Sequence, residues 1–231
     1  MSLSAVQRIF LQAVASNGAF KVAESKDILK DICGRVDSAY TDETYGETVE
    51  AINAKIREFN QELKTIMYPP EKANFLVFIN LTTDAMNKVQ FDKPKQELDF
   101  FRDLLMAIIK SEEKYIGILD ATNLVSTNKG KALTKSRAQA IIEEWIEEKY
   151  FFEKDYQITL GPRAITEFSN YFQSEFADEV NSCPLCKQVS FWGLTCTECK
   201  EEFHRDCITT YLKKKTDCPF CHAAWNTPVN Q

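Results

Sequence analysis

Apolar residues recur at helical spacing three times in the first part of the chain. The first stripe consists of Val6, Ile9, Phe10, Ala13 and Val14, and Gly18 can end that helix. A second, short helix fits residues 27–33. A third, longer helix is predicted to bury one face, made of Val49, Ile52, Ile56, Phe59 and Leu63.

Two short apolar runs follow these helices, at residues 65–68 and 75–81, on either side of the Pro69-Pro70 pair. Proline interrupts a strand, and the second run is continuously apolar, so the two runs are predicted to be the strands of a hairpin. Three helices followed by a hairpin is the order of elements in a winged helix.

The same order is predicted again further along the chain. A strong helical stripe contains Leu98, Phe101, Leu104, Leu105, Ile108 and Ile109. A short strand fits residues 115–119, a short helix residues 121–126 and a turn residues 128–131. Thr134 or Ser136 can then cap a helix. That helix carries Ala138, Ile141, Ile142, Trp145, Ile146 and Tyr150.

A second hairpin is predicted next, from residues 150–152, a turn at 153–155 and an alternating strand. The inward positions of that strand are Tyr156, Ile158 and Leu160. Pro162 occupies a first helical position, and Ile165, Phe168 and Phe172 follow at helical spacing. We therefore expect a mainly α (α+β) chain with tandem winged-helix domains at 1–90 and 91–176, followed by a small domain at 180–225.

Composition and charge narrow the function classes. The chain is 44% hydrophobic and 27% charged, as in ordinary globular proteins, with a formal net charge of −6 and a pI near 5.2. In a winged helix that reads DNA, the third helix needs basic side chains. Here a small basic cluster, Lys129, Lys131, Lys135 and Arg137, precedes an acidic second half containing Glu143, Glu144, Glu147 and Glu148. The carboxylates would repel phosphate, so we expect these domains to bind protein and any DNA contact to be weak or indirect.

The last part of the chain concentrates its metal-binding chemistry. Seven of the eight cysteines and one of the two histidines form four pairs, each with two residues between its members. The eight residues are Cys183, Cys186, Cys196, Cys199, His204, Cys207, Cys218 and Cys221. This spacing suits two closed tetrahedral zinc sites. Cys33 lies far from the others and is predicted to be a buried small hydrophobe.

Two other uses of cysteine were weighed against zinc. A disulfide framework requires an oxidising compartment, and the first twenty residues read as an amphipathic helix rather than a signal peptide. A redox Cys-x-x-Cys motif would occur once, beside a βαβ pattern. We therefore expect two structural zinc ions and a reducing compartment.

Four ligand pairs can be connected in two ways. Sequential pairing would join the first two pairs in one site, as in a zinc ribbon. Interleaved pairing assigns Cys183, Cys186, His204 and Cys207 to one zinc ion and Cys196, Cys199, Cys218 and Cys221 to the other. An aromatic residue at Phe203 and a short helix after the sixth ligand, bearing Ile208, Tyr211 and Leu212, favour this cross-braced arrangement.

Cross-braced modules with seven cysteines and one histidine resemble the RING and PHD families. A PHD finger usually has Trp two residues before its last cysteine pair, where this chain has Thr216. The sequences Cys183-Pro-Leu-Cys186 and Cys218-Pro-Phe-Cys221 instead resemble RING ligases. That resemblance implies that Leu185, Tyr211, Pro219 and Phe220 form the groove for a ubiquitin-conjugating enzyme. His222 stands where many RING ligases have Arg or Lys.

Nearly the whole chain resembles the non-SMC element 1 family of the SMC five/six complex. The residues that carry the resemblance are the RING pattern, the segment from Tyr156 to Ile165 and the run from Phe78 to Thr83. The resemblance implies a nuclear subunit in DNA repair that pairs with a MAGE-family subunit through its winged helices, beside a kleisin-type subunit. Family members are described as ubiquitin ligases stimulated by the MAGE partner. The alternatives are a RING that only holds the complex together, or a chromatin reader.

Overall fold

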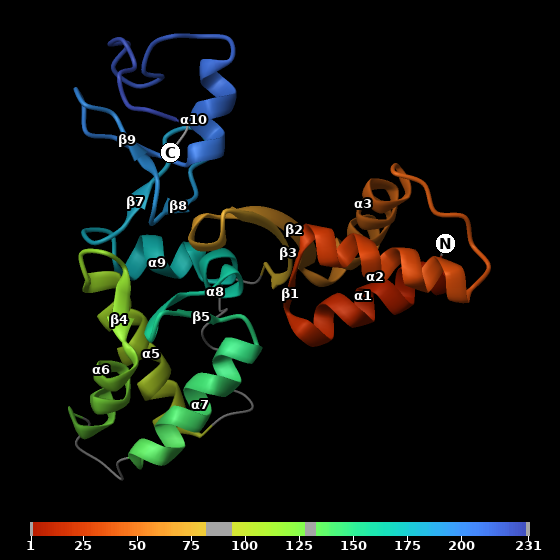
Figure 1. Cartoon of the computed structure of the whole chain (residues 1–231), viewed down its shortest axis with the longest axis horizontal. Helices are drawn as coiled ribbons and strands as arrows, with labels where there is room; N and C mark the ends of the chain where they lie inside the picture. Colours follow the sequence, from red (N-terminus) through yellow and green to blue (C-terminus); the bar gives the residue numbers. More distant parts are fainter. Residues whose placement is uncertain (1, 82–93, 128–132, 230–231) are drawn as a thin grey trace. The chain divides into compact units, whose positions relative to one another are not determined.

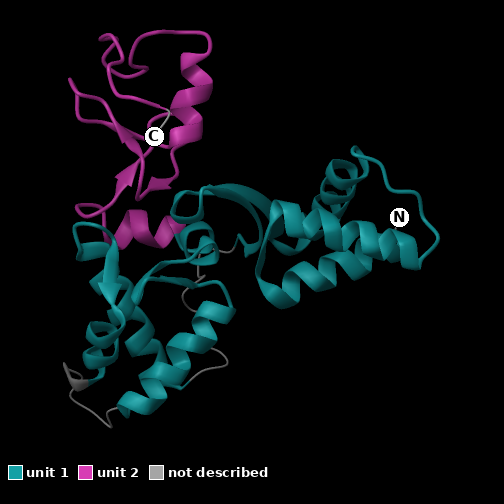
Figure 2. Ribbon diagram, viewed as in Figure 1, with its two compact units in different colours: residues 1–168 teal, residues 169–231 magenta. Residues whose placement is uncertain are grey.

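The structure is a computed structural model that describes residues 2–81, 94–127 and 133–229. The predicted turn at 128–131 and the predicted boundary near residue 90 lie outside the described residues. The chain forms two compact units, residues 1–168 and 169–231 (Figure 2). No helix within the described ranges has the length and apolar character needed to cross a membrane.

The first unit begins with three helices, α1 (Ala5–Asn17), α2 (Val22–Arg35) and α3 (Thr44–Ile56) (Figure 1). Ser4 caps α1, because its hydroxyl accepts from the Gln7 amide at 3.2 Å and its own amide donates to Gln7 at 2.8 Å. The core between these helices buries Phe10, Val14, Leu29, Ile32, Cys33, Ile52, Ile56, Leu63 and Leu76. The predicted helix, its end at Gly18 and the burial of Cys33 are confirmed, but Ile9 of the predicted apolar stripe is 45% exposed.

The third helix is shorter than predicted. Asn60 adopts a left-handed conformation with φ 56° after the 3-10 turn Arg57–Phe59, and β2 (Gln61–Tyr68) starts there. Phe59 is consequently 71% exposed, whereas Leu63 reaches the core from a strand. The Asn53 side chain holds that strand to α3 through two hydrogen bonds. Its Nδ2 donates to the Leu63 carbonyl oxygen at 2.9 Å, and its Oδ1 accepts from the Leu63 amide at 2.7 Å.

The predicted first hairpin is confirmed. β2 pairs antiparallel with β3 (Ala73–Asn80), across the 3-10 turn Pro69–Glu71, with Thr65 opposite Leu76. A short strand that the periodicity did not reveal, β1 (Ala19–Lys21), joins the other edge to give the order β1-β3-β2. With only three residues, β1 is too short to show alternation.

The second half of the first unit repeats this layout. Helix α5 (Lys95–Lys110) buries every residue of its predicted stripe. It is followed by β4 (Tyr115–Gly117), α6 (Ile118–Asn123), the 3-10 turn Leu124–Thr127 and α7 (Lys135–Glu147). Thr134 caps α7 by accepting from the Arg137 amide at 3.2 Å. The predicted strand at 115–119 is too long, because α6 starts at Ile118 and leaves Leu119 76% exposed.

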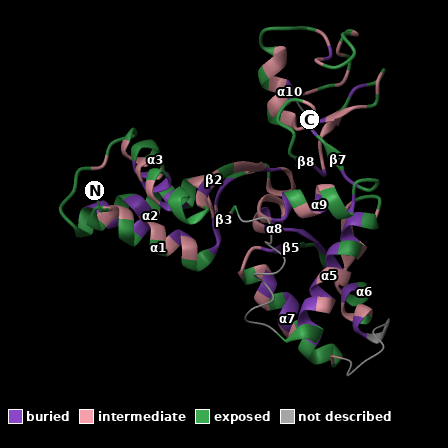
Figure 3. Ribbon diagram, turned by 180° about the vertical axis from the view of Figure 1, so that it is seen from behind, coloured by how far each residue is buried: buried purple, intermediate pink, exposed green. Residues whose placement is uncertain are grey.

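The second predicted hairpin consists of β5 (Phe151–Lys154) and β6 (Gln157–Leu160), in the sheet order β4-β6-β5. Its turn lies at Asp155 and Tyr156, so Tyr156 is outside the strand and 83% exposed, contrary to the predicted alternation. Helix α8 (Pro162–Glu167) has Pro162 in its first turn, as predicted. Burial in this half is greatest where α5, α7 and the hairpin meet (Figure 3).

The two winged helices share a buried junction within the first unit. Tyr68 is fully buried, and its hydroxyl donates to the Leu160 carbonyl oxygen at 2.8 Å. Its ring lies edge-on to Phe75 at 5.5 Å and to Phe152 at 5.6 Å. Both halves thus contribute to one apolar contact, which accounts for their appearance as a single compact unit.

The second unit starts with α9 (Ser169–Glu175), which the sequence placed in the second winged helix. Its Gln173 side-chain amide donates to Lys187 O at 2.7 Å and to Ser182 at 3.1 Å. The remaining elements are β7 (Asn181–Ser182), β8 (Val189–Ser190), β9 (Leu194–Thr195), β10 (Glu202–Phe203) and α10 (Arg205–Leu212). The domain boundaries at 90, 176 and 180 stay a prediction.

Candidate metal centre

Three of the four ligand pairs lie in the same backbone turn. After the first cysteine of each pair, the chain folds back so that its carbonyl accepts an amide from four residues on: Lys187 N to Cys183 O at 2.8 Å, Lys200 N to Cys196 O at 3.1 Å and His222 N to Cys218 O at 3.0 Å. Lys187, Lys200 and His222 all have φ near +62°. The turn explains the two-residue spacing, because it aims both thiols of a pair to the same side.

The pairs combine in the interleaved way. The sulfur and ring nitrogen atoms of Cys183, Cys186, His204 and Cys207 lie within 4.8 Å of one another. The same limit holds for Cys196, Cys199, Cys218 and Cys221. Each group joins a first-half pair to a second-half pair, so each could hold one metal ion with four protein ligands.

The remaining ligand pair, His204 and Cys207, begins with a histidine whose ring is oriented by the backbone. Its Nε2 lies 2.9 Å from the Val189 carbonyl oxygen, and its Nδ1 lies 3.1 Å from Cys186 Sγ. Because a carbonyl only accepts, Nε2 carries the proton and Nδ1 presents its lone pair to the thiols. The imidazole is therefore held in the tautomer that a metal requires.

Burial and neighbouring groups shift the pKa values of the thiols, upward for some and downward for others. Burial, together with the neighbouring Cys186 and Cys183, raises the pKa of the Cys207 thiol to about 12. Burial and the adjacent cysteines likewise raise the pKa of Cys199 to about 12. At Cys196 burial opposes ionisation, but hydrogen bonds from the Cys199 and Glu198 amides and from the Cys199 and Cys218 thiols together outweigh it and lower the pKa to about 7. Several thiolates at such short range need a cation, and sulfur and imidazole favour zinc over magnesium or calcium.

A small apolar core lies between the two groups. Phe203, on β10, and Ile208, on α10, are fully buried beside Cys183, Cys196 and Cys218. Trp225, which sequence reasoning did not single out, packs edge-on against Phe203 at 5.7 Å. Its indole nitrogen donates to Thr227 O at 2.7 Å. Position 225, after the last ligand, gave no spacing signal that would have identified it.

Glu202 is a second residue that the sequence did not reveal. Its carboxylate accepts from Ser190 at 2.6 Å, from the Gly193 amide at 2.8 Å and from Asn181 at 2.8 Å. These donors lie on β7, on β8 and just before β9, whereas Glu202 lies on β10, which ends one residue before the ligand His204. The carboxylate thereby fixes the strand that leads into the histidine.

The residues predicted to form a conjugating-enzyme groove differ in exposure. Leu185 is 39% exposed and Phe220 is 56% exposed, while Tyr211 and Pro219 are half-buried. Leu185 lies inside the first cysteine pair and Phe220 inside the last, so each belongs to a different metal group. His222 is in neither group, and its Nδ1 lies 3.5 Å from the Asp217 carboxylate.

The described part of the basic cluster is paired internally. Arg137 bonds the buried Glu97 carboxylate at 2.9 Å and Glu144 at 2.8 Å, and Lys135 donates to Asn123 at 2.7 Å. Lys129 and Lys131 lie outside the described residues. Arg137 and Lys135 at the start of α7 therefore make contacts within the fold, and weak or indirect DNA contact stays a prediction.

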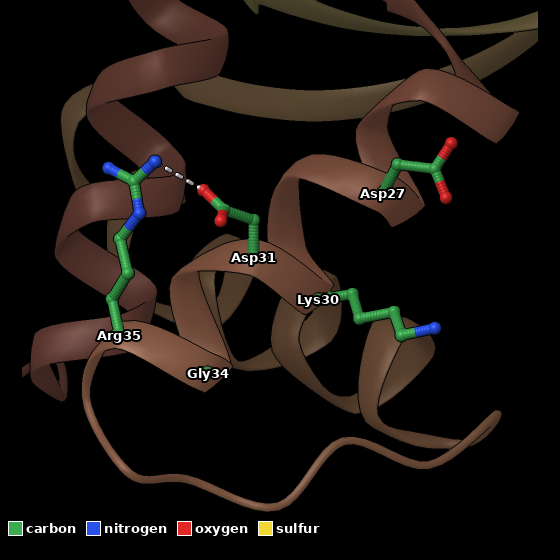
Figure 4. A pocket seen from close by; sticks show the side chains of 5 residues that line it. All are labelled: Asp27, Lys30, Asp31, Gly34 and Arg35. Atoms are coloured by element: carbon green, nitrogen blue, oxygen red, sulfur yellow. Dashed lines mark ion pairs between the residues drawn. The ribbon is translucent and has the colours of Figure 1, made fainter.

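An open hollow of about 500 Å³ lies on one face of α2 (Figure 4). Its lining residues, Asp27, Lys30, Asp31, Gly34 and Arg35, follow helical spacing, and Asp31 pairs with Arg35 at 2.8 Å. Gly34 contributes no side chain to the hollow, and a β-carbon there would meet no atom within 4 Å. Opposite charges alternate around it, and it lacks the buried polar groups of a ligand site.

Comparison with known proteins identifies the family. Residues 7–168 match the family described as Nse1 non-SMC component of SMC5-6 complex, and residues 183–221 match a RING-like domain. The Drosophila melanogaster protein named non-structural maintenance of chromosomes element 1 homolog is 32% identical over 98% of this chain and 97% of its own length. The human protein of that name is 28% identical over 95% of this chain and 84% of its own length.

A solved structure supports the same assignment at the level of fold. A chain of the Nse1-Nse3-Nse4 complex superposes with a TM-score of 0.79 over 97% of this chain and 98% of that chain, at 20% identity. The predicted fold class, with its tandem winged helices and RING-like end, is confirmed. With the family matched from residue 7 to residue 168 and a RING-like domain after it, this chain belongs to the Nse1 family.

Proposed function

We propose that this chain is a RING-type ubiquitin-protein ligase subunit of the SMC5-6 complex, acting in chromosome maintenance and DNA repair in the nucleus. One observation carries the ligase assignment: Leu185 and Phe220 expose apolar side chains on two short loops, each within a Cys-x-x-Cys pair of a different group. Exposed apolar groups on so small a module usually mark an interface.

Such a ligase acts without a nucleophile or an acid–base pair of its own. It holds a ubiquitin-conjugating enzyme and restrains the ubiquitin thioester, so its contribution is proximity and orientation. Leu185, Tyr211, Pro219 and Phe220 would contact the conjugating enzyme. The two metal groups would hold their loops at a constant separation.

We propose zinc as the resident metal, bound by the four residues of each group. All four positions of each site are protein ligands, which is typical of structural zinc and leaves no position for an activated water. When bound, zinc supplies the positive charge that lets the crowded thiols remain ionised. The His204 tautomer and the open thiol clusters support this assignment.

We also propose two protein partners, a MAGE-family subunit at the winged-helix unit and a kleisin-type subunit beside it. Support comes from the resemblance of nearly the whole chain to a member of an Nse1-Nse3-Nse4 complex. The internal pairing of Arg137 and Lys135 adds to this, since it favours protein contact over DNA contact.

The test is discharge of ubiquitin from charged conjugating enzymes onto free lysine, with the chain alone and with the two partner subunits. We expect discharge that falls at least tenfold in Leu185→Ala and in Phe220→Ala. Phe59→Ala, at an apolar position of the first unit that is more exposed than either (71%), is the control and should retain full activity. Zinc content would be measured for every variant, so that loss of the fold is not mistaken for loss of the contact.

A second candidate function is a RING that only holds the MAGE and kleisin subunits together. The observation favouring it is His222, which stands where many ligases have Arg or Lys and whose ring is paired with Asp217. Complete absence of discharge across a panel of conjugating enzymes, with both zinc ions bound and the partners present, would establish this scaffold role instead.

A further inference from the structure

The turn of the second hairpin has an unusual residue at its tip. Lys154 pairs with Gln157, so the loop between the strands contains only Asp155 and Tyr156. Both have positive φ, 52° and 61°, as a two-residue type I′ turn requires. Glycine or asparagine suits the second position, whereas an aromatic residue there is conformationally unfavourable.

Packing in the unit does not compensate for this conformation. The Tyr156 side chain is 83% exposed, the most exposed of the large apolar or aromatic residues in the described part of the chain. A strained backbone at an exposed aromatic residue points to a role outside the fold of the single chain.

A second exposed apolar residue lies on the neighbouring segment. The Tyr156 carbonyl oxygen accepts from the Ile118 amide at 3.0 Å, and the next residue, Leu119, is 76% exposed in the first turn of α6. Two large side chains on hydrogen-bonded segments thus present an apolar contact surface, which we call the wing patch (Leu119 and Tyr156).

Acidic side chains border the wing patch. Asp120, Glu153 and Asp155 are exposed next to these two residues in sequence, and among residues 118–120 and 153–157 the one cation is Lys154. The Asp120 carboxylate lies beside Gly117, 3.3 Å from where a β-carbon would be, which keeps it close to the start of α6. An apolar centre with an acidic border repels nucleic-acid phosphate and complements a basic protein surface.

We propose that the wing patch is a docking surface for one folded protein partner that offers an apolar pocket bordered by Lys or Arg. Tyrosine is enriched among residues that dominate binding energy, and its rigid ring enters such a pocket with little loss of conformational entropy. The proposal rests on the proposed function in one respect: the partner is a subunit of the same complex.

The test uses the full chain and the purified counterparts of Nse3 and Nse4 as probes. Tyr156→Asn suits the left-handed backbone, so the isolated variant should melt at or above the temperature of the wild-type chain. Its affinity for one of the two subunits should nevertheless fall at least tenfold, measured by calorimetry. Leu119→Asn should weaken the same complex, and Phe59→Asn, with 71% exposure elsewhere, should not.

Several outcomes would overturn the assignment. One is that both wing-patch variants bind the two subunits as the wild type does. Another is that light scattering shows the variants lose a dimer of this chain rather than a subunit. A third is that the wild-type chain binds neither subunit, which would remove the partner assignment as well. Ubiquitin discharge is measured separately and reports on the ligase proposal by itself.

Discussion

The two compact units differ in the chemistry that stabilises the core of each. The second winged helix is built around aromatic rings: Trp145 is fully buried, with Phe101 at 4.8 Å, Phe100 at 5.7 Å and Phe151 at 5.8 Å. In the second unit three of the five residues in the buried cluster around Phe203 are candidate ligands, Cys183, Cys196 and Cys218. The core of the second winged helix therefore consists of packed aromatic rings, whereas most residues of the buried cluster in the second unit are cysteines.

The difference shows where the stability of each unit comes from. In the first unit many apolar contacts contribute small amounts, and no single one is decisive. In the second unit the buried apolar cluster is small, so we expect metal binding to supply most of the folding free energy of the ligand module. Removing the metal and truncating the apolar core should therefore affect different units.

Metal removal should have the largest effect. Because structural zinc in small modules contributes about 10–16 kcal/mol, a chelator should unfold the second unit and leave the first folded. Amide NMR would show loss of dispersion within residues 169–231 and none within residues 1–168. Retained dispersion there after both ions are removed would contradict the assignment of zinc as the source of stability.

Acid should act on the same unit, because a thiolate ligand must lose its proton to bind metal. Zinc release on lowering the pH, followed with a chromogenic chelator, should precede any change in the first unit. A first unit that melts together with zinc release would show that the two cores are not independent.

Truncating the aromatic core should have the next largest effect, and on the other unit. Trp145→Ala removes a fully buried ring and should lower the free energy of unfolding of the first unit by about 3–5 kcal/mol. Denaturant titration measures this, and zinc content should remain at the wild-type value. Phe59→Ala, at an exposed site, is the control and should change stability by less than about 0.5 kcal/mol.

Alkali should reveal the junction between the winged helices. Burial raises the pKa of Tyr68 above its usual value of 10.0, so its contribution to stability is full below about pH 10 and is lost as the pH rises further. Tyr68→Phe removes the hydrogen bond to Leu160, which should reduce stability by about 1–2 kcal/mol at neutral pH. The variant should also show a shallower loss above pH 10, and the loss that remains comes from the other tyrosines whose pKa burial raises, among them Tyr150, Tyr45 and Tyr115. Identical alkaline slopes for the two proteins would contradict this.

The smallest effect is expected at the hollow on α2. Gly34 lies in the helix with open space where a β-carbon would be, so Gly34→Ala should stabilise the first unit by about 0.5–1 kcal/mol. Thermal melting of the intact chain would measure it. Destabilisation would indicate that the helix end is constrained in a way the described contacts do not show.

Much of this fold could be predicted because the strongest patterns are local. The stripe from Leu98 to Ile109 and the Thr134 cap depend on neighbours in the same helix. Phe59 and Tyr156 were predicted to lie inside a helix and a strand, but both are exposed at turns. The turns use left-handed residues, Asn60 after the helix and Asp155 with Tyr156 in the hairpin, and neither contains the glycine that would have marked it in the sequence. The periodic pattern of apolar residues continues past such a turn, so periodicity alone predicts a helix or strand that is too long.

The metal groups could be predicted because their signal is also local. The turn that starts at Cys183, Cys196 and Cys218 places two residues between the ligands of a pair, and this spacing is visible in the sequence. The residues that support the metal groups could not be predicted in this way. Glu202 and Trp225 act on partners well separated in sequence, and single carboxylates and indoles are too common for their positions to stand out.

The Tyr68 hydrogen bond also has a consequence for biosynthesis. Its acceptor, Leu160, lies 92 residues further along the chain. At a synthesis rate of about 5–20 residues per second, Tyr68 leaves the ribosome roughly 5 to 20 s before its partner. During that interval the first winged helix exposes the aromatic surface that the second will cover, so a nascent chain paused there is an expected client of chaperones.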